Sequence, residues 1–350
     1  MKILMLSPLW FPVARDSHGG IETYLPALTG ALEKLGHDVS IIASGDSVLE
    51  TGKIIPVVDR NLFGEMSEER ASEYTYFEQH ALMEVLASAG AFDVVHSHFG
   101  PSAYSLSELG ALRDRLLHTH HTPVTQDLCW FVSQHPDLWV STVSEFQARK
   151  LRAAGATRCT TIPNGIDPDL FTFASEPGDG LFFLGRMERS KGPDVAIELA
   201  ARLERPITLA GPIVDPGFFR SSIKPRLGDQ VRYEGVIDHA AKIELFGSSA
   251  CVLLPVRGYE SFGMVALESM SCGTPVVGAA VGALPEVIEH GVTGFVGRGL
   301  DELSAYVEEA VKLDRAKVRS HALGKFDLNA IAARFTGVYE EMSRLRMIDG

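Results

Sequence analysis

The sequence predicts an α/β protein of two domains, each an open parallel sheet with helices on both faces. In both halves of the chain, short apolar runs alternate with glycine-bearing loops and with segments of helical spacing. The chain has 350 residues, which is enough for two domains that each bury a core. A polar stretch with Pro and Gly at 172–180 marks the expected boundary between them.

The composition is that of an ordinary globular protein, with 45% hydrophobic and 22% charged residues. A formal net charge of −13 argues against a nucleic-acid partner, because binding nucleic acid needs clustered Lys and Arg. No apolar run is long enough to span a bilayer, and the four cysteines are dispersed, without metal-ligand spacing. We therefore expect a cytoplasmic protein with reduced thiols and at most peripheral membrane contact.

The N-terminal half opens as strand, loop, helix and strand. Residues 3–7 form an apolar run, a loop with two prolines follows, and Gly19-Gly20 stand where a helix begins. Leucines at helical spacing continue this helix until Gly36, and residues 39–43 form the next strand. The glycine pair alone is weak evidence for a phosphate-binding loop, since G-x-G-x-x-G is absent.

The later segments of this half are less regular. Residues 46–72 are polar and irregular, and we expect a mobile excursion there. Helical spacing predicts helices over 73–90 and 102–115. Residues 140–146 form a strand that enters a helix, with Ser144 as its N-cap.

Five histidines gather around two of the predicted strands. They are His96, His98, His118, His120 and His121. Successive strand residues alternate faces, so His118 and His120 share a side that His121 does not, and no carboxylate or cysteine stands at ligand spacing. We therefore predict no metal site. The histidines instead follow the carboxyl ends of strands, where open α/β sheets bind ligands.

The C-terminal half begins with the apolar run 181–184 and a loop that holds two cations, Arg186 and Lys191. Such a pair could neutralise a diphosphate, although two solvated loop residues are the simpler explanation. Further strands are expected over 206–210 and 231–237, and helices over 242–247, 300–313 and 327–345.

The stretch 250–294 organises this second half. An apolar run leads through a glycine-bearing loop to Phe262-Gly263 and a helical segment that starts at Met264. Free backbone N–H groups at such a helix start favour an anion. Glu260 precedes the helix and Glu268 lies two turns along it, roughly 12 Å away, so the two carboxylates could take sugar hydroxyls on either side of a diphosphate. Taken alone, solvated glutamates that complement the helix dipole explain the pair equally well.

Several motifs, in order along the chain, together resemble the retaining glycosyltransferases of family 4, which have the GT-B fold. They are Gly19-Gly20-Ile21-Glu22, His118-Thr119-His120-His121, Pro163-Asn164-Gly165-Ile166-Asp167, Gly185-Arg186-x4-Lys191-Gly192 and Glu260-x7-Glu268. The resemblance implies two Rossmann-like domains facing each other across a cleft. An acceptor-binding domain would span 1–170, a nucleotide-sugar-binding domain 178–330, and a C-terminal helix in 331–350 would cross back to the first domain.

The resemblance also implies roles for residues. The catalytic centre would comprise His121, Glu260 and Gly20, with His120 in place of His121 if the motif is aligned one residue off. The donor would be bound by Gly19, Gly20, Arg186, Lys191, Phe262, Gly263, Met264 and Glu268. In this scheme Arg186 and Lys191 contact the phosphates, Glu268 the ribose hydroxyls, and Glu260 the sugar.

The implied reaction transfers a hexose-type sugar from a nucleotide-diphosphate sugar to a hydroxyl acceptor, with retention of configuration and without a metal or other cofactor. The resemblance favours a UDP-sugar as donor, then a GDP-sugar, and a small molecule, a glycan or a lipid-linked acceptor. Acceptor contacts are expected in 46–75 and 100–135, where Tyr104, Trp130 and Phe131 either stack on the acceptor or belong to the core. Two alternatives stay open: another GT-B enzyme, such as a nucleotide-sugar epimerase or phosphorylase, or a catalytically silent nucleotide-sugar-binding subunit.

Overall fold

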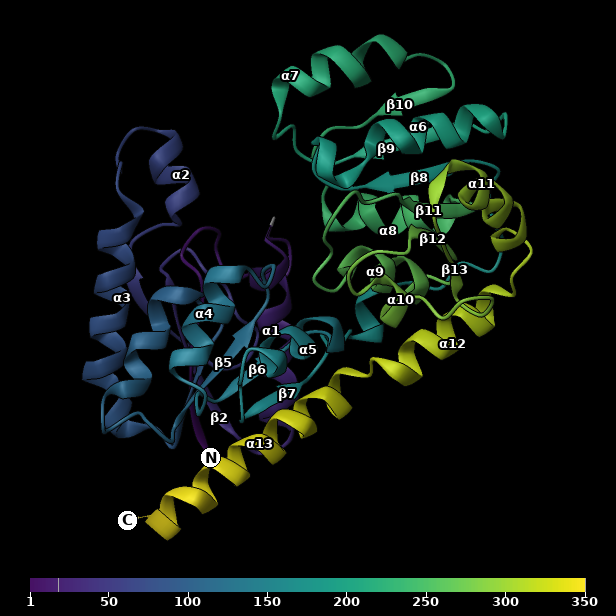
Figure 1. The fold of residues 1–350 in the computed structure, drawn as a ribbon. Helices are drawn as coiled ribbons and strands as arrows, with labels where there is room; N and C mark the ends of the chain where they lie inside the picture. The colour runs from purple at the N-terminus through teal and green to yellow at the C-terminus, as the bar shows by residue number, and fades with distance from the viewer. Residues whose placement is uncertain (18, 350) are drawn as a thin grey trace. The chain divides into compact units, whose positions relative to one another are not determined.

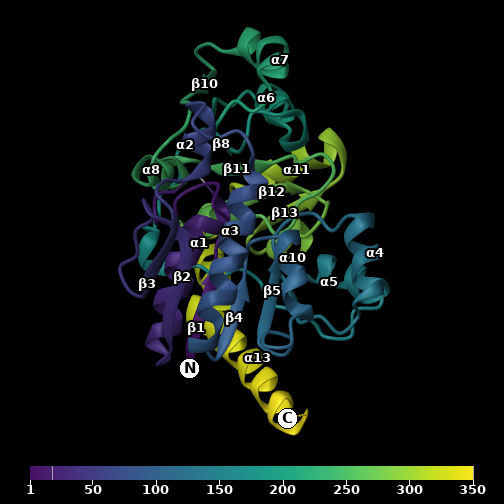
Figure 2. The same cartoon turned by 90° about the vertical axis from the view of Figure 1, so that its left-hand side faces the viewer.

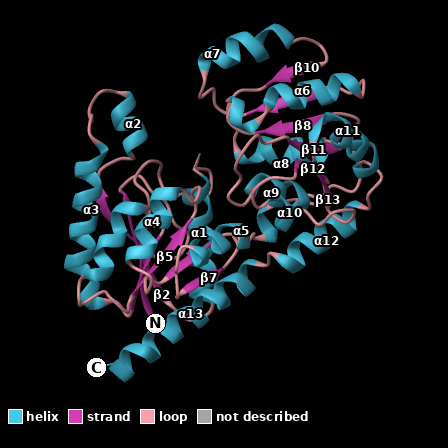
Figure 3. Ribbon diagram, viewed as in Figure 1, coloured by secondary structure: helices cyan, strands magenta, loops and turns pink. Residues whose placement is uncertain are grey.

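A computed structural model of the chain describes residues 1–17 and 19–349. It divides into two compact units: unit 1 comprises Met1–Gly165 together with the segment from Leu328 onward, and unit 2 comprises Ile166–Asp327. In each unit, helices flank a parallel sheet, as the ribbons show (Figure 1, Figure 3). The predicted α/β class is therefore confirmed.

Unit 1 contains a seven-stranded parallel sheet of order β3-β2-β1-β4-β5-β6-β7, and Figure 2 shows β3 to β5 side by side. The strands are β1 (Lys2–Leu6), β2 (Asp38–Ser44), β3 (Lys53–Val58), β4 (Val94–Ser97), β5 (Leu116–His120), β6 (Val140–Thr142) and β7 (Cys159–Thr161). The α-helices are α1 (Gly20–Lys34), α2 (Leu62–Ser67), α3 (Tyr74–Ser88), α4 (Gln126–Gln134), α5 (Glu145–Ala153) and α13 (Leu328–Asp349). The strand order reverses between β1 and β4, so the switch point of the sheet lies at the carboxyl ends of these two central strands.

Strand β1 is a continuous apolar run because both of its faces are buried. Ile3 and Met5 are buried in one cluster with residues of α1 and α13, whereas Leu4 and Leu6 are buried in another with residues of α3. A parallel strand covered by helices on both faces has no solvent-facing side. The uninterrupted apolar sequence thus corresponds to a central, fully covered strand.

The C-terminal helix α13 packs on unit 1. Phe335, Tyr339 and Met342 are buried in the same cluster as Leu25 and Leu28 of α1. The Tyr339 hydroxyl also lies 2.7 Å from Nδ1 of His96, a residue of the central strand β4. This confirms the expectation that the last helix returns to the N-terminal domain.

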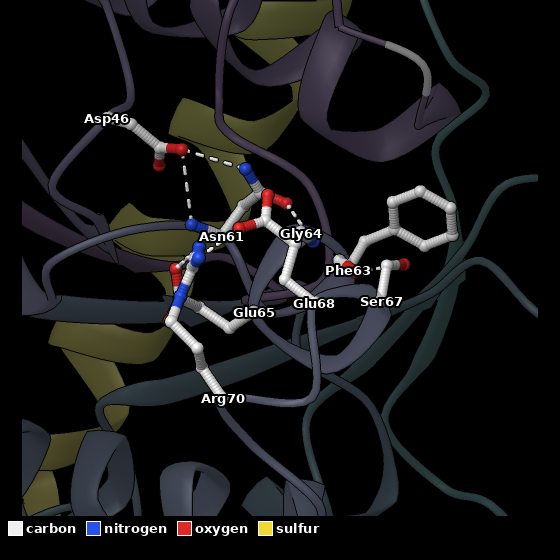
Figure 4. A network of polar contacts seen from close by, with 8 residues as sticks. All are labelled: Asp46, Asn61, Phe63, Gly64, Glu65, Ser67, Glu68 and Arg70. Carbon is white, nitrogen blue, oxygen red and sulfur yellow. Dashed lines mark hydrogen bonds and ion pairs between the residues drawn. The ribbon is translucent and has the colours of Figure 1, made fainter.

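The segment 46–72 contains regular structure, so the prediction that it is irregular was wrong. It holds β3, which pairs in parallel with β2, and the short helix α2. Asn61 caps α2 by accepting the Gly64 N–H at 3.0 Å, and its side-chain amide donates to Asp46 at 2.8 Å (Figure 4). At the other end of α2, Arg70 forms an ion pair with Glu65 at 2.7 Å. Polar contacts fix the ends of α2, while Val57 of β3 and Leu62 of α2 are buried in the apolar core of the unit.

Residues 102–115 do not form the predicted α-helix. A 3-10 helix, η2 (Pro101–Glu108), is followed by turns that lead into β5. Ala103 and Leu106 are buried against the sheet, and residues three apart share one face of a 3-10 helix. The apolar residues that face the sheet were therefore identified correctly, but they lie on a 3-10 helix and not on an α-helix.

Unit 2 contains a six-stranded parallel sheet of order β10-β9-β8-β11-β12-β13, with its switch point between β8 and β11. The strands are β8 (Leu181–Leu184), β9 (Ile207–Ala210), β10 (Val231–Tyr233), β11 (Cys251–Leu254), β12 (Val276–Ala279) and β13 (Gly294–Gly297). The α-helices are α6 (Pro193–Arg202), α7 (Pro216–Phe218), α8 (His239–Ser248), α9 (Met264–Ser271), α10 (Leu284–Val287), α11 (Gly299–Ala310) and α12 (Arg315–Lys325).

Helix α12 was not predicted, because few of its residues are apolar. Only Arg315, Val318 and Ala322 are buried among its members. Arg315 instead fixes the helix by polar contacts: Nε donates to the Ala174 carbonyl at 2.7 Å and Nη1 to the Ser249 carbonyl at 2.9 Å. A buried guanidinium with several carbonyl acceptors replaces the apolar stripe on which helix prediction depends.

Candidate active site

Unit 1 has a cavity of about 240 Å³ at the switch point of its sheet. It is lined by segments that follow β1, β4 and β5 and by the start of α1. The lining residues are Pro8, Ile21, Glu22, Ser97, His98, Phe99, Gly100, Tyr104, His118, Thr119, His120, His121 and Thr122. The carboxyl ends of parallel strands thus bring four of the five noted histidines to one cavity, the place where open α/β sheets bind ligands.

The histidine rings are held by neutral partners. His96 bonds to Tyr339 and Thr119, His118 lies 2.8 Å from the Ser107 hydroxyl, and His98 Nδ1 lies 2.9 Å from His121 Nε2. Among residues 1–17 and 19–349, no group of three His, Cys, Asp or Glu side chains is placed to hold a metal ion. The rings therefore have roles as hydrogen-bonding groups within the sheet and the cavity.

Burial lowers the pKa of all five histidines. The pKa of His118 and that of His121 fall to about 3, that of His120 falls to about 4, and those of His96 and His98 lie well below the usual value. A neutral imidazole has one N–H donor and one acceptor nitrogen. His121 is therefore neutral at physiological pH and can donate or accept a hydrogen bond without being charged.

Gly19 and Gly20 lie at the start of α1, beside this cavity. Gly19 occupies the N-cap position and Gly20 is the first helical residue. A Cβ atom at Gly19 would lie 2.0 Å from Oε2 of Glu22, whereas one at Gly20 would meet nothing within 4 Å. A side chain at Gly19 would thus displace the Glu22 carboxyl, and Gly20 leaves the helix start open.

The aromatic residues proposed for acceptor stacking have different environments. Tyr104 is only 4% exposed and belongs to a core cluster, with Phe131 packed against it at a ring distance of 5.5 Å. Tyr104 is therefore a core residue whose edge lines the cavity. Trp130, on α4, is 67% exposed and is the most exposed of the three aromatic residues.

In unit 2, the loops that follow β8 and β11 bring a cation and a carboxylate together. Lys191 Nζ lies 2.7 Å from Oε2 of Glu260, although the two residues are 69 positions apart. The side chains are 25% and 18% exposed. The predicted phosphate-binding lysine and the predicted sugar-binding glutamate thus form one partly buried pair at the switch point of this sheet.

Two glycines allow close backbone contacts around the Lys191–Glu260 pair. Gly192 has φ of +74°, and a Cβ there would lie 2.2 Å from the Pro255 carbonyl oxygen at the end of β11. Gly282 has φ of +57°, and a Cβ there would lie 2.2 Å from the Glu260 carbonyl oxygen. Larger residues would be strained at both positions. At Gly192 they would push the loop after β8 away from the end of β11, and at Gly282 they would push the loop after β12 away from Glu260.

Helix α9 starts at this site. Gly263 is its N-cap in the left-handed conformation, with φ of +104°, and Met264 is its first residue. Phe262 is buried, with its ring edge-on to Phe326 at 5.6 Å, so only its backbone is available to a ligand. About one turn along α9, Glu268 is 8% exposed and its Oε1 lies 2.7 Å from Lys242 Nζ.

Arg186 is not part of this pair. Its guanidinium is 55% exposed and forms an ion pair with Glu188 at 2.8 Å on its own loop. The structure therefore brings Lys191, Glu260 and the start of α9 together around the switch point, and leaves the Arg186 side chain on the surface of the loop that also carries Lys191.

Family models match both halves of the chain. The model described as Glycosyltransferase Family 4 matches residues 18–170, and the model described as Glycosyl transferases group 1 matches residues 174–323. This chain belongs to glycosyltransferase family 4. It is therefore a glycosyltransferase, as the motifs predicted.

Relatives of this glycosyltransferase align over nearly its whole length. A phosphatidyl-myo-inositol mannosyltransferase of Mycolicibacterium smegmatis is 26% identical, and the match covers 98% of this chain and 94% of the relative. A D-inositol 3-phosphate glycosyltransferase of Geodermatophilus obscurus is 28% identical, with 96% and 88% covered. The crystal structure of Anabaena HepE in complex with UDP-glucose has a TM-score of 0.73 at 19% identity, covering 98% of this chain and 100% of that one. The likeness in structure confirms the predicted GT-B fold.

Sequence reasoning missed two residues of the glycosyltransferase's sites. Lys242 on α8 pairs with Glu268, but no motif contains it and its spacing on α8 gives no signal. Glu22 was quoted only as part of the Gly19-Gly20-Ile21-Glu22 motif, yet it is 4% exposed and lines the cavity. A glutamate two residues after a glycine pair at a helix start was the available signal. Among the described residues, no helix is both long and apolar enough to cross a bilayer.

Replacing Glu22 with glutamine is expected to stabilise unit 1 at alkaline pH. Burial raises the pKa of Glu22 to about 7, although the backbone N–H groups of Glu22 and Phe11 oppose this rise. A raised carboxyl pKa means that the stability present below the unfolded pKa is lost as pH rises through 7. At pH 8 the variant should gain up to about 3 kcal/mol, and at pH 4.5 almost nothing.

Urea denaturation at the two pH values measures this difference. Tryptophan fluorescence reports on unit 1 alone, because Trp10, Trp130 and Trp139 are the three tryptophans of the chain and all lie there. A gain that is the same at both pH values would show that Glu22 is not buried as a neutral acid.

Proposed function

We propose that this glycosyltransferase transfers a hexose-type sugar from a UDP-sugar to a hydroxyl acceptor, with retention of configuration and without a metal ion. Unit 2 binds the donor, and unit 1 binds the acceptor and supplies His121. The observation that carries the proposal is the Lys191–Glu260 pair at 2.7 Å beside the start of α9. A cation, a carboxylate and a helix N-terminus at one point suit a diphosphate that bears a sugar.

Each group has a distinct role in this scheme. Lys191 and the N–H groups at the start of α9 bind the diphosphate and stabilise the charge that develops on it. Glu260, released from Lys191 by the phosphate, accepts hydrogen bonds from sugar hydroxyls. Glu268 accepts from the ribose hydroxyls, and Lys242 holds its carboxylate in place.

In the proposed step, the acceptor oxygen forms a bond to the anomeric carbon while the bond from that carbon to the diphosphate oxygen breaks. The acceptor proton passes to the departing phosphate oxygen on the same face, so the configuration is retained. A retaining double displacement needs a carboxylate nucleophile within about 5 Å of a second carboxyl group. In the structure Glu260 is paired with Lys191 and Glu268 with Lys242. In the proposed complex both carboxylates accept hydrogen bonds from hydroxyl groups of the donor, so neither acts as the nucleophile.

Two named relatives act on inositol compounds, and a structural neighbour was crystallised with UDP-glucose. We propose a polyol, a glycan or a lipid-linked headgroup as the acceptor class, with inositol compounds first among those to test. UDP-sugars come before GDP-sugars among donors.

A donor screen tests the proposal. Thermal stability and sugar release are measured with UDP-, GDP-, ADP- and dTDP-sugars in EDTA, for the wild type and for Glu268→Ala. We expect one donor to raise the melting temperature and to be hydrolysed slowly, with both effects lost in the variant. Addition of myo-inositol or inositol phosphate should then accelerate release of the nucleoside diphosphate. Strict dependence on added Mg²⁺ or Mn²⁺, or no response to any donor, would contradict the proposal.

A further inference from the structure

His98 and His121 form a hydrogen-bonded pair at the cavity of unit 1. His98 Nδ1 lies 2.9 Å from His121 Nε2, and the two rings are tilted by 30° at a centroid distance of 5.2 Å. His98 follows β4 and His121 follows β5, two neighbouring strands of the sheet. One of the two nitrogens donates and the other accepts, so the pair couples the tautomers of both rings.

The surroundings of His98 decide which nitrogen donates. Its ring is 2% exposed and packs against His96 at a centroid distance of 4.1 Å. Its other nitrogen, Nε2, is buried and has no hydrogen-bond partner among the described residues. If His121 donated, His98 would hold its own proton on Nε2 as an orphaned buried donor, which is costly and rare. The favoured arrangement places the His98 proton on Nδ1, from which it donates to His121 Nε2.

The same arrangement fixes His121. Its Nε2 accepts from His98, so the proton of the neutral ring is on Nδ1. His121 is less deeply buried than His98 and lines the cavity, and Nδ1 is not among the buried nitrogens that lack a partner. The N–H of His121 is therefore available to a ligand in the cavity.

We propose that His98 is a positioning residue that holds His121 as its Nδ1–H tautomer, so that His121 donates a hydrogen bond to the reacting sugar or acceptor. This inference rests on the proposed function for the part played by His121. It adds a residue outside the motif of His121 and states which nitrogen of the ring faces the substrate. Glu22 and His120 line the same cavity, but neither has a hydrogen bond to the His98–His121 pair among the described residues.

The experiment compares three forms of the full chain, labelled with ¹⁵N-histidine: wild type, His98→Phe and His98→Asn. Phenylalanine keeps a ring but removes the donor, whereas the asparagine side-chain amide offers an N–H near the place of Nδ1. Nitrogen NMR of the imidazoles reports the tautomer of His121, whose signals are assigned by their loss in His121→Gln. Turnover of the donor identified in the screen is measured in parallel, with His80→Gln, on the exposed face of α3, as the control.

We expect His121 to be protonated on Nδ1 in the wild type and in His98→Asn, and to shift toward the Nε2–H tautomer in His98→Phe. The kcat of His98→Phe should fall by about 10²-fold with the donor KM little changed, and His98→Asn should recover most of it. A wild-type His121 protonated on Nε2, or a tautomer unaffected by His98→Phe, would overturn the inference.

The two readouts separate this inference from the proposed function. The NMR measurement needs no substrate, so it decides the role of His98 even if no donor is turned over. A protein that transfers sugar normally in the His98→Phe form would contradict the positioning role alone. Unfolding of any variant is recognised from tryptophan fluorescence, since all three tryptophans lie in unit 1.

Discussion

Replacing Lys191 with alanine is expected to lower kcat/KM for donor turnover by about 10³-fold. The lysine is the one cation that the structure places on the Glu260 carboxylate, at 2.7 Å, in the part of the chain that is described. In the reaction it neutralises charge that grows on the departing diphosphate, so its loss should reduce kcat more than donor binding. Lys191→Arg keeps the positive charge but replaces a compact ammonium with a larger, planar guanidinium, so we expect it to recover only part of the activity.

Steady-state release of the nucleoside diphosphate measures this effect, with Arg202→Ala as the matched control. Arg202 forms an ion pair with Asp301, whose side chain is 97% exposed, so its removal should change neither activity nor stability appreciably. Melting temperatures establish that Lys191→Ala is folded. Activity within threefold of the wild type would show that Lys191 does not contact the diphosphate, and the donor site would have to be sought elsewhere.

Unit 1 is expected to lose most of its stability between pH 6.5 and about pH 5. The five histidines around β4 and β5 have lowered pKa values in the fold, chiefly because they are buried. The unfolded chain takes up their protons below its own pKa of about 6.5, whereas the fold does not, so stability falls as pH falls. Five such groups together lower the free energy of unfolding by up to about 7 kcal/mol for each pH unit. A drop of one to two pH units therefore removes as much free energy as the whole stability of a typical domain, about 5–15 kcal/mol.

Glu22 opposes this trend, because its raised pKa of about 7 adds stability as pH falls toward the unfolded value. Urea titrations followed by tryptophan fluorescence at several pH values give the slope. His118→Asn should make it shallower by about 1.4 kcal/mol per pH unit whatever its effect on absolute stability. A free energy of unfolding that is flat from pH 7 to pH 5 would mean that the histidines are protonated in the fold.

Much of the fold was predictable because central parallel strands are continuous apolar runs. β1, β8 and β11 were each found from such runs, and glycines marked the loops that follow them. The segments that were missed are held by polar contacts instead. Asn61 and Asp46 fix α2, and Arg315 fixes α12 through backbone carbonyls, so neither helix has the apolar stripe that periodicity detects.

The candidate sites were predicted through motifs, and the structure adds the pairings that motifs do not contain. Lys191 and Glu260 were expected to act on one donor, but their direct contact joins residues 69 positions apart, and Gly192 lets the loop that carries Lys191 approach the end of β11. Lys242 and His98 could not be assigned from the sequence. Each acts on a motif residue from a neighbouring element, and no spacing rule connects a residue to its partner across a sheet.

Anomer-resolved NMR of the released or transferred sugar decides whether this glycosyltransferase transfers a sugar with retention of configuration. The donor is an α-linked UDP-sugar in EDTA, and the product is recorded before mutarotation can exchange the anomers. We expect UDP together with a sugar or glycoside in the α configuration, and neither product from Glu268→Ala. A product in the β configuration would contradict retention, and the absence of turnover with any nucleotide sugar and acceptor would contradict the donor site itself.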